Sequence, residues 1–198
     1  MLDLTNSADD TTIILPAAKA VSRYMDLRLG RFFTKDAAAL AREYSTRDLG
    51  ADGDRASGLL YVDDIATTAG LSILVDTLQV GSFAGLTPLA ATEYELRPRN
   101  AALGPDPWPY TEIALTSWGT SAWSGPVQIT AVWGWPAVPE AIKQACIQLV
   151  GILLMKSPRA TREVNLGLGT VLATSSAAQS IIGELMSVYS RNGGVVVA

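Results

Sequence analysis

The sequence predicts an α+β fold in which a helical bundle, made of two long helices and a C-terminal helix, carries an inserted antiparallel β-sheet or sandwich. Apolar residues recur at helical spacing towards both ends of the chain, whereas the middle contains short alternating segments separated by Gly, Asp, Pro and Ser. We therefore expect an N-terminal helix within residues 1–36, a β insertion domain at 37–136, a second core helix at 137–157, and an extended arm with a helix and tail at 158–198.

The first helix is predicted over residues 13–29. Its apolar stripe consists of Ile14, Ala18, Val21 and Met25. Pro16 is compatible with the first turn, where its missing N–H would be unpaired in any case. Gly30 is placed to end the helix in a left-handed conformation.

The central region predicts six short strands, bounded by turn-forming residues. They cover residues 38–44, 59–62, 71–76, 93–97, 111–115 and 127–133. We expect Asp63 and Asp64 to end the second strand, because acidic residues are depleted within strands.

A corner rich in Trp and Pro joins the last strand to the second long helix. Gly134 and Pro136 end the strand, and Pro139 fits the first turn of the helix that follows. The corner residues of interest are Trp133, Trp135, Pro136 and Pro139.

The second helix is predicted over residues 139–155, with an apolar face that also includes Cys146. We expect it to pack against the first helix through Ala-rich stripes that permit close approach. The predicted contact residues are Ala18, Val21, Met25, Ile142, Ala145, Leu149 and Leu153.

The C-terminal part of the chain predicts an extended arm followed by one more helix. Ser175 or Ser176 is placed to cap a helix that ends near Tyr189. The arm and tail carry apolar residues between glycines, and we expect these segments and the last helix to contact neighbouring proteins. The predicted contact residues are Arg159, Arg162, Val164, Leu166, Leu168, Val171, Val195, Val196 and Val197.

No constellation of catalytic or metal-ligating residues emerges from the sequence. The chain has no histidine, which excludes His-activated nucleophiles and His metal sites, and its one cysteine is predicted on an apolar helix face. Asp52 and Asp54 lack the spacing of a calcium loop, and Gly167 and Gly169 lack the lysine of a phosphate loop. We therefore expect no enzyme activity, no cofactor and no metal.

The composition is apolar for a protein without a membrane span. Hydrophobic residues make up 48% of the chain and charged residues 17%, and the net charge is −4. No segment reaches the roughly 20 apolar residues that span a bilayer, and no cluster of Lys and Arg predicts nucleic-acid binding. An Ala-rich composition and a surface covered by partner subunits remain alternative explanations.

The tryptophans leave a binding module open as an alternative. Trp108, Trp118 and Trp123 fall in predicted loops, where aromatic side chains can form platforms for sugars. A carbohydrate- or protein-binding β module with helical flanks is therefore the second interpretation. Tryptophan is also enriched at protein interfaces, which favours structural corners or subunit contacts.

Three segments, in this order, resemble the phage head-to-tail adaptor (head–tail connector) family of siphophages and actinophages. The first is 21–30, with a Ser-Arg pair, an Asp and a closing Leu-Gly. The second is 94–101 with Pro109 and Tyr110, and the third is the corner at 129–139. The helix at 177–191 also resembles the closing helix of that family.

The resemblance implies a non-enzymatic virion protein made in the host cytoplasm and located at the capsid–tail junction, or neck. Such subunits form a homo-oligomeric ring, expected to be a dodecamer, which binds below the portal protein and extends the DNA channel used for genome ejection. The ring offers a docking platform to stopper, head-completion and tail proteins, and double-stranded DNA passes through without specific binding. Another neck or tail-completion protein is a further alternative.

Overall fold

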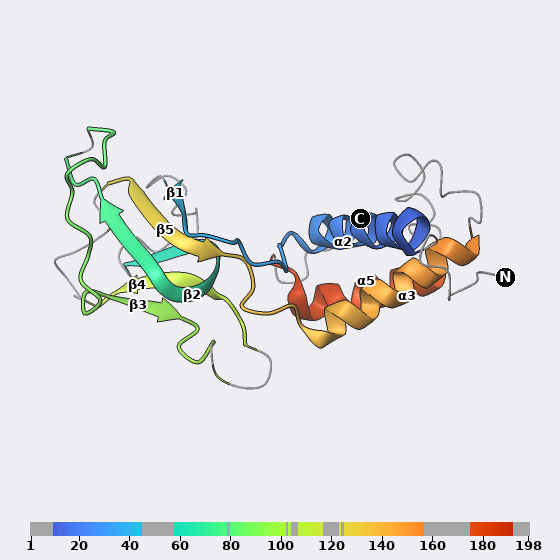
Figure 1. Ribbon diagram of the computed structural model, residues 1–198. Coiled ribbons are helices and arrows are strands. Elements are labelled where there is room, and N and C mark those ends of the chain that lie inside the picture. Colours follow the sequence, from blue (N-terminus) through green and yellow to red (C-terminus); the bar gives the residue numbers. More distant parts are fainter. Residues whose placement is uncertain are drawn as a thin grey trace. The chain divides into compact units, whose positions relative to one another are not determined.

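The structure is a computed structural model that describes residues 10–44, 58–78, 80–101, 103, 107–116, 123, 125–156 and 175–191. The fold is α+β, with helices from both ends of the chain and an antiparallel sheet between them in sequence (Figure 1). The chain divides into a helical unit, Met1–Arg31 with Val138–Ala198, and a β unit, Phe32–Ala137.

The helical unit contains, among its described residues, a π-helical turn η1 (Asp10–Ile14), α2 (Leu15–Leu29), α3 (Glu140–Lys156) and α5 (Ser176–Tyr189). The three α-helices pack against one another in all three pairs. Pro16 occupies the first turn of α2, and Gly30 ends that helix at φ 64° with its N–H donated to Asp26 O.

The core of the helical unit lies between the three helices. Its buried residues are Ala17, Val21, Met25, Leu29, Ile142, Ala145, Leu149, Val150, Leu153, Ala178, Ile182 and Leu185. Ala18, expected at the contact between the first two helices, is only half-buried, and Ala17 takes the buried position instead. Val21 and Met25 are buried as expected, so the difference is confined to this one position of a helix that packs against both α3 and α5.

The last helix, α5, belongs to this core. Ser175 caps it by accepting the N–H of Ala178, and Ile182 and Leu185 are buried. Arg31 Nη1 donates to Tyr189 O at 3.5 Å, and Arg191 N donates to Leu29 O at 3.3 Å. The expected place of this helix in the helical bundle is therefore confirmed, because one face of it completes the fold of its own subunit.

The β unit is built on a five-stranded antiparallel sheet of described strands, in the order β1-β5-β2-β4-β3. The strands are β1 (Leu40–Tyr44), β2 (Leu59–Val75), β3 (Tyr94–Arg97), β4 (Tyr110–Leu115) and β5 (Val127–Trp133). Along β5, buried residues alternate with half-buried ones from Val127 to Trp133, as its period-2 pattern requires.

Strand β2 corrects the expectation of two separate strands broken at Asp63 and Asp64. Its first part pairs with β4 and its second part with β5, and the register shifts between Tyr61 and Ile65 and again as far as Ser72. Such irregularities bend a strand without ending it. The one long strand β2 therefore forms hydrogen-bonded pairs with both of its neighbours, β4 and β5.

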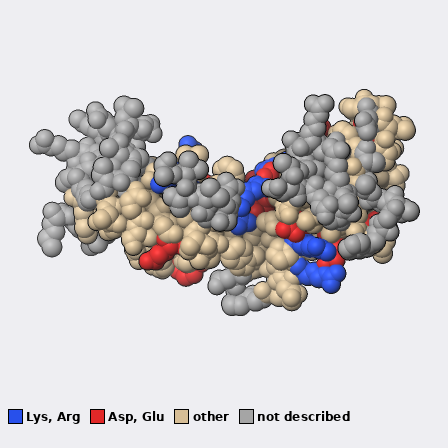
Figure 2. Space-filling view, turned by 180° about the vertical axis from the view of Figure 1, so that it is seen from behind, with Lys and Arg blue, Asp and Glu red and all other residues tan. Residues whose placement is uncertain are grey.

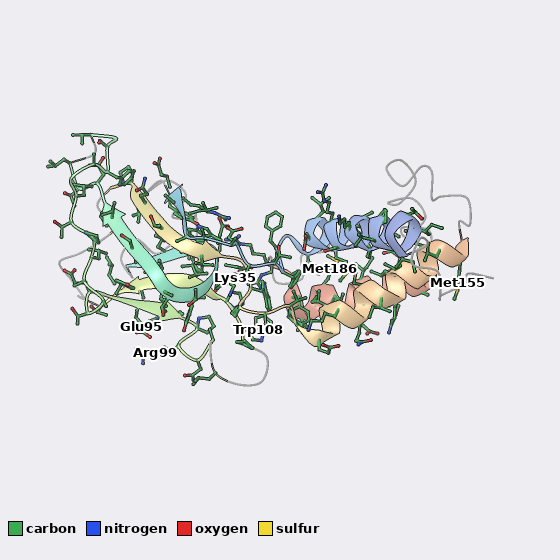
Figure 3. All side chains as sticks on the ribbon, in the orientation of Figure 1. Lys35, Glu95, Arg99, Trp108, Met155 and Met186 are labelled. Atoms are coloured by element: carbon green, nitrogen blue, oxygen red, sulfur yellow. The ribbon has the colours of Figure 1, made fainter. Side chains whose placement is uncertain are left out.

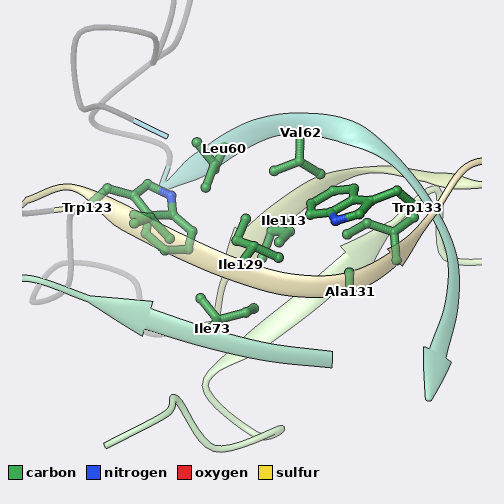
Figure 4. Packing of buried hydrophobic residues seen from close by; sticks show 10 residues of the cluster. Leu60, Val62, Ile73, Ile113, Trp123, Ile129, Ala131 and Trp133 are labelled. Carbon is green, nitrogen blue, oxygen red and sulfur yellow. The ribbon is translucent and has the colours of Figure 1, made fainter. Parts of the chain in front are cut away.

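The curved strands enclose the core of the β unit (Figure 4). Its buried residues are Leu60, Val62, Ile65, Ile73, Ile113, Trp123, Val127, Ile129, Ala131 and Trp133. Trp123 comes from a predicted loop, yet it is 6% exposed and donates its indole N–H to Gly58 O. In neither unit do the described residues include a helix long and apolar enough to cross a bilayer.

Candidate functional site

The chemically reactive residues singled out in the sequence do not assemble into a site within the described part of the chain. Described His, Cys, Asp and Glu residues form no group of three that could hold a metal ion. Cys146 is half-buried on α3, and burial, followed by the nearby charge of Asp26, raises the pKa of its thiol. A thiol with a raised pKa is a poor nucleophile at neutral pH.

Several sequence-based candidates lie outside the described residues. These are the aspartates and glycines of the two rejected loop motifs and all nine residues expected to contact a neighbour. They are Asp52, Asp54, Gly167, Gly169, Arg159, Arg162, Val164, Leu166, Leu168, Val171, Val195, Val196 and Val197.

Asp63 belongs to a polar cluster that spans three strands. Arg42 of β1 pairs with Asp63 of β2 at 2.7 Å, and the guanidinium lies over the ring of Trp133 on β5 at 4.5 Å. The Tyr44 hydroxyl donates to Asp63 Oδ2 and accepts the N–H of Asp63, both at 3.2 Å. Because the carboxylate is neutralised and hydrogen-bonded, β2 continues through this position.

Tyr44 is held in its neutral form at this cluster. Burial is the largest cause, and it raises the pKa of Tyr44 from 10.0 to about 12. The Asp63 carboxylate also favours the neutral phenol, while Arg42 acts in the opposite direction. A phenol that stays protonated at neutral pH fits a bracing role rather than general-base chemistry.

Asp64 anchors the predicted corner from the other side of β2. Its carboxylate Oδ2 accepts the indole N–H of Trp135 at 3.2 Å, and its carbonyl accepts the N–H of Gly134 at 2.8 Å. The Trp135 ring is buried between Phe33, at 5.1 Å between centroids, and Trp108, at 4.9 Å. The corner is therefore an internal aromatic cluster of the β unit.

Gly134 allows two segments of the β unit to cross closely. Its φ is +103°, and a Cβ at this position would lie 2.0 Å from Thr34 O. The N–H of Asp36 donates to Trp133 O at 2.9 Å just beside this crossing. The sequence pattern does not predict this crossing, because Thr34 and Gly134 are far apart in the chain.

The described tryptophans pack against other residues of the β unit. Trp123, Trp133 and Trp135 are buried, and Trp108, which is labelled in Figure 3, is half-buried against Trp135. Trp118 lies outside the described residues. Trp108 and Trp123 lie outside the helices and strands, as expected, and both pack against other residues of the β unit.

Each of the three helices presents at least one large apolar side chain to solvent, and we call these the exposed helix residues. They are Leu27 (82% exposed), Ile147 (64%), Met155 (83%) and Val188 (56%). Met155 lies near the C-terminal end of α3 (Figure 3). Ile147 was detectable in the sequence, since it falls between Gln144 and Gln148 on the polar face of the predicted helix.

Charge on the described surface is sparse. On the face shown in Figure 2, basic and acidic atoms lie in small groups within a larger area of other residues. Among the described residues visible on that face, Lys and Arg form no broad patch of the kind that phosphate binding needs. Comparison of the chain with protein-family models and with curated proteins found no match.

Proposed function

We propose that this chain is a non-enzymatic subunit of a phage head-to-tail adaptor ring. The ring, expected to be a dodecamer, binds below the portal protein in the virion neck. It extends the DNA channel and provides the docking platform for stopper and tail proteins. The order of the three adaptor-like segments along the chain supports this assignment.

The observation that carries the proposal is the set of exposed helix residues. Leu27, Ile147, Met155 and Val188 are each more than half exposed on a unit of only modest size. Scattered apolar residues are normal on a monomer, but Met155 and Leu27 are exposed by more than four-fifths. Apolar interfaces between neighbouring subunits would remove this surface from water.

The carbohydrate-binding alternative has less support. A sugar platform needs an exposed aromatic face. The rings of the described tryptophans pack into the core or against one another. Under the adaptor proposal, the tryptophans are structural residues that pack the β unit.

Co-expression with the portal protein of the same phage tests the proposal. We expect a portal complex that contains a ring of this chain, visible by electron microscopy and measurable by mass. A chain that stays monomeric and unbound beside an assembled portal would refute the adaptor assignment.

A matched pair of variants tests the surface that carries the proposal. Ile147→Glu places a charge on an exposed helix residue and should reduce ring recovery at least tenfold if that residue is covered by a neighbour. Gln148→Glu adds the same charge at the adjacent exposed position and removes no apolar surface. Equal ring recovery for the two variants would show that Ile147 is not at a subunit contact.

A further inference from the structure

One ridge of α2 faces solvent and carries two basic side chains between two leucines. The residues of this α2 ridge follow at intervals of four and are all exposed: Leu15, Lys19, Arg23 and Leu27. Lys19 and Arg23 form no ion pair with another described residue. Like charges four residues apart on a helix repel each other slightly. An acidic group that approaches the α2 ridge from another molecule would offset that repulsion.

One ridge of α5 has the complementary character. Ser180, Glu184 and Val188 also follow at intervals of four and are exposed, and we call them the α5 ridge. Glu184 forms no ion pair with another described residue. Next to it, a Cβ added at Gly183 would meet nothing within 4 Å. The α5 ridge therefore offers a carboxylate, an aliphatic side chain and open surface for the longer side chains of the α2 ridge.

The helices α2 and α5 run in the same direction within the subunit. They pack against each other, and the contacts of Arg191 with Leu29 and of Arg31 with Tyr189 hold their C-terminal ends together. A rotation about a ring axis does not reverse a direction along that axis, so helices that run along the axis are parallel in neighbouring copies.

A parallel contact between the two ridges matches their side chains in a single register. Four residues advance either helix by about 6 Å. An arrangement that sets Arg23 opposite Glu184 therefore also sets Leu27 opposite Val188. The charged pair and the aliphatic pair are satisfied together.

We propose that the α2 ridge of one copy packs against the α5 ridge of the next copy of this chain, with Arg23 paired to Glu184. The proposal rests on the proposed function for the existence of the ring in which the copies meet. The contact uses two different surfaces of each copy, which is the kind of contact that closes into a ring. It covers Leu27 and Val188, two of the four exposed helix residues.

Other partners fit the α2 ridge less well. Anionic membranes and duplex DNA are bound by larger clusters of basic residues than Lys19 and Arg23 provide. Neither of them offers an aliphatic surface for Leu27 beside an anionic group for Arg23 at a helical interval. The α5 ridge of a second copy supplies both.

Charge reversal tests the contact on portal-bound rings of the full chain. Arg23→Glu alone and Glu184→Arg alone each set like charges opposite one another at every contact and should reduce ring recovery at least tenfold. An equal mixture of the two variant chains should restore recovery, because copies that alternate around an even-numbered ring again pair opposite charges at every contact. Arg28→Glu is the matched control, since Arg28 is exposed on α2 roughly 140° around the helix from Arg23. We expect wild-type ring recovery for the control.

The outcomes separate the ridge contact from the adaptor assignment. Wild-type ring recovery for either charge reversal would overturn the contact while leaving the adaptor proposal standing. A mixture that stays defective would also overturn it, because a contact within one copy or with another partner is not rescued by mixing. Failure of the wild-type chain to form rings on the portal would overturn the adaptor proposal itself.

A photo-crosslinker at Val188 gives a second readout on rings without any charge reversal. A crosslink to α2 of another copy, seen as a covalent dimer, supports the contact. A crosslink only within the same chain, to the portal protein or to DNA refutes it.

Discussion

Among the described glycines, Gly134 has the least room for a side chain. A Cβ there would lie 2.0 Å from Thr34 O, and φ is +103°. Gly134→Ala combines backbone strain with overpacking and should lower the free energy of unfolding by roughly 2–6 kcal/mol. All five tryptophans belong to the β unit, so their fluorescence reports its unfolding in denaturant.

Gly151→Ala is the matched control for this substitution. Gly151 lies within α3, and a Cβ there would meet nothing within 4 Å. Alanine in a helix interior should raise stability by roughly 0.5–1 kcal/mol. Equal effects of the two substitutions would contradict the close crossing at Thr34.

Tyr44 should make the β unit sensitive to alkaline pH. Its pKa is about 12 in the folded protein against an ordinary value of 10.0. The raised pKa means that its stabilising contribution is complete below pH 10 and is lost as the pH rises through 12. The free energy of unfolding should therefore fall over this window more steeply for the wild type than for Tyr44→Phe. Parallel pH profiles for the two proteins would rule out this role.

The limits of sequence reasoning are clearest at Asp63 and Asp64. Acidic residues inside an apolar segment predict a strand end, because an unpaired carboxylate does not suit a sheet. Here Arg42 and Trp135, each distant in sequence, satisfy the two carboxylates. Such long-range pairing leaves no local signal, and the same holds for Thr34 against Gly134.

At the scale of elements, α3 separates a buried face from an exposed one. Leu149 has no exposed surface and Ile147 is 64% exposed. Leu149→Ala should cost roughly 2–5 kcal/mol, while Ile147→Ala should cost under about 0.5 kcal/mol in the isolated chain. Far-ultraviolet circular dichroism in denaturant measures both. A loss below about 0.5 kcal/mol for Leu149→Ala would contradict the helix packing.

Helix positions were readable from the sequence because their signals are local. Gly30 and Ser175 end and begin helices within a turn of the predicted positions, and the apolar spacing of 139–155 matches α3. The choice between Ala17 and Ala18 was not readable, because it depends on how α2 divides its contacts between α3 and α5. The burial of Trp123 depends in the same way on distant strands.

At the scale of the whole molecule, the charge of the chain bears on the DNA channel of the proposed ring. The chain has 15 basic and 19 acidic residues, which gives −4 per subunit, and a ring multiplies that charge. Strong phosphate contacts would slow DNA that must slide during ejection. We therefore expect weak duplex binding by the assembled ring across a salt series. Tight binding at low salt, lost steeply as salt rises, would indicate a basic channel instead.

The location of the chain in the particle tests the adaptor assignment most directly. A small tag on the chain, in particles that still infect, can be labelled and imaged by electron microscopy. The adaptor account predicts label at one site only, the neck between portal and tail, with a closed ring of density at that level. Label along the tail tube, over the capsid surface, or absent from purified particles would contradict it.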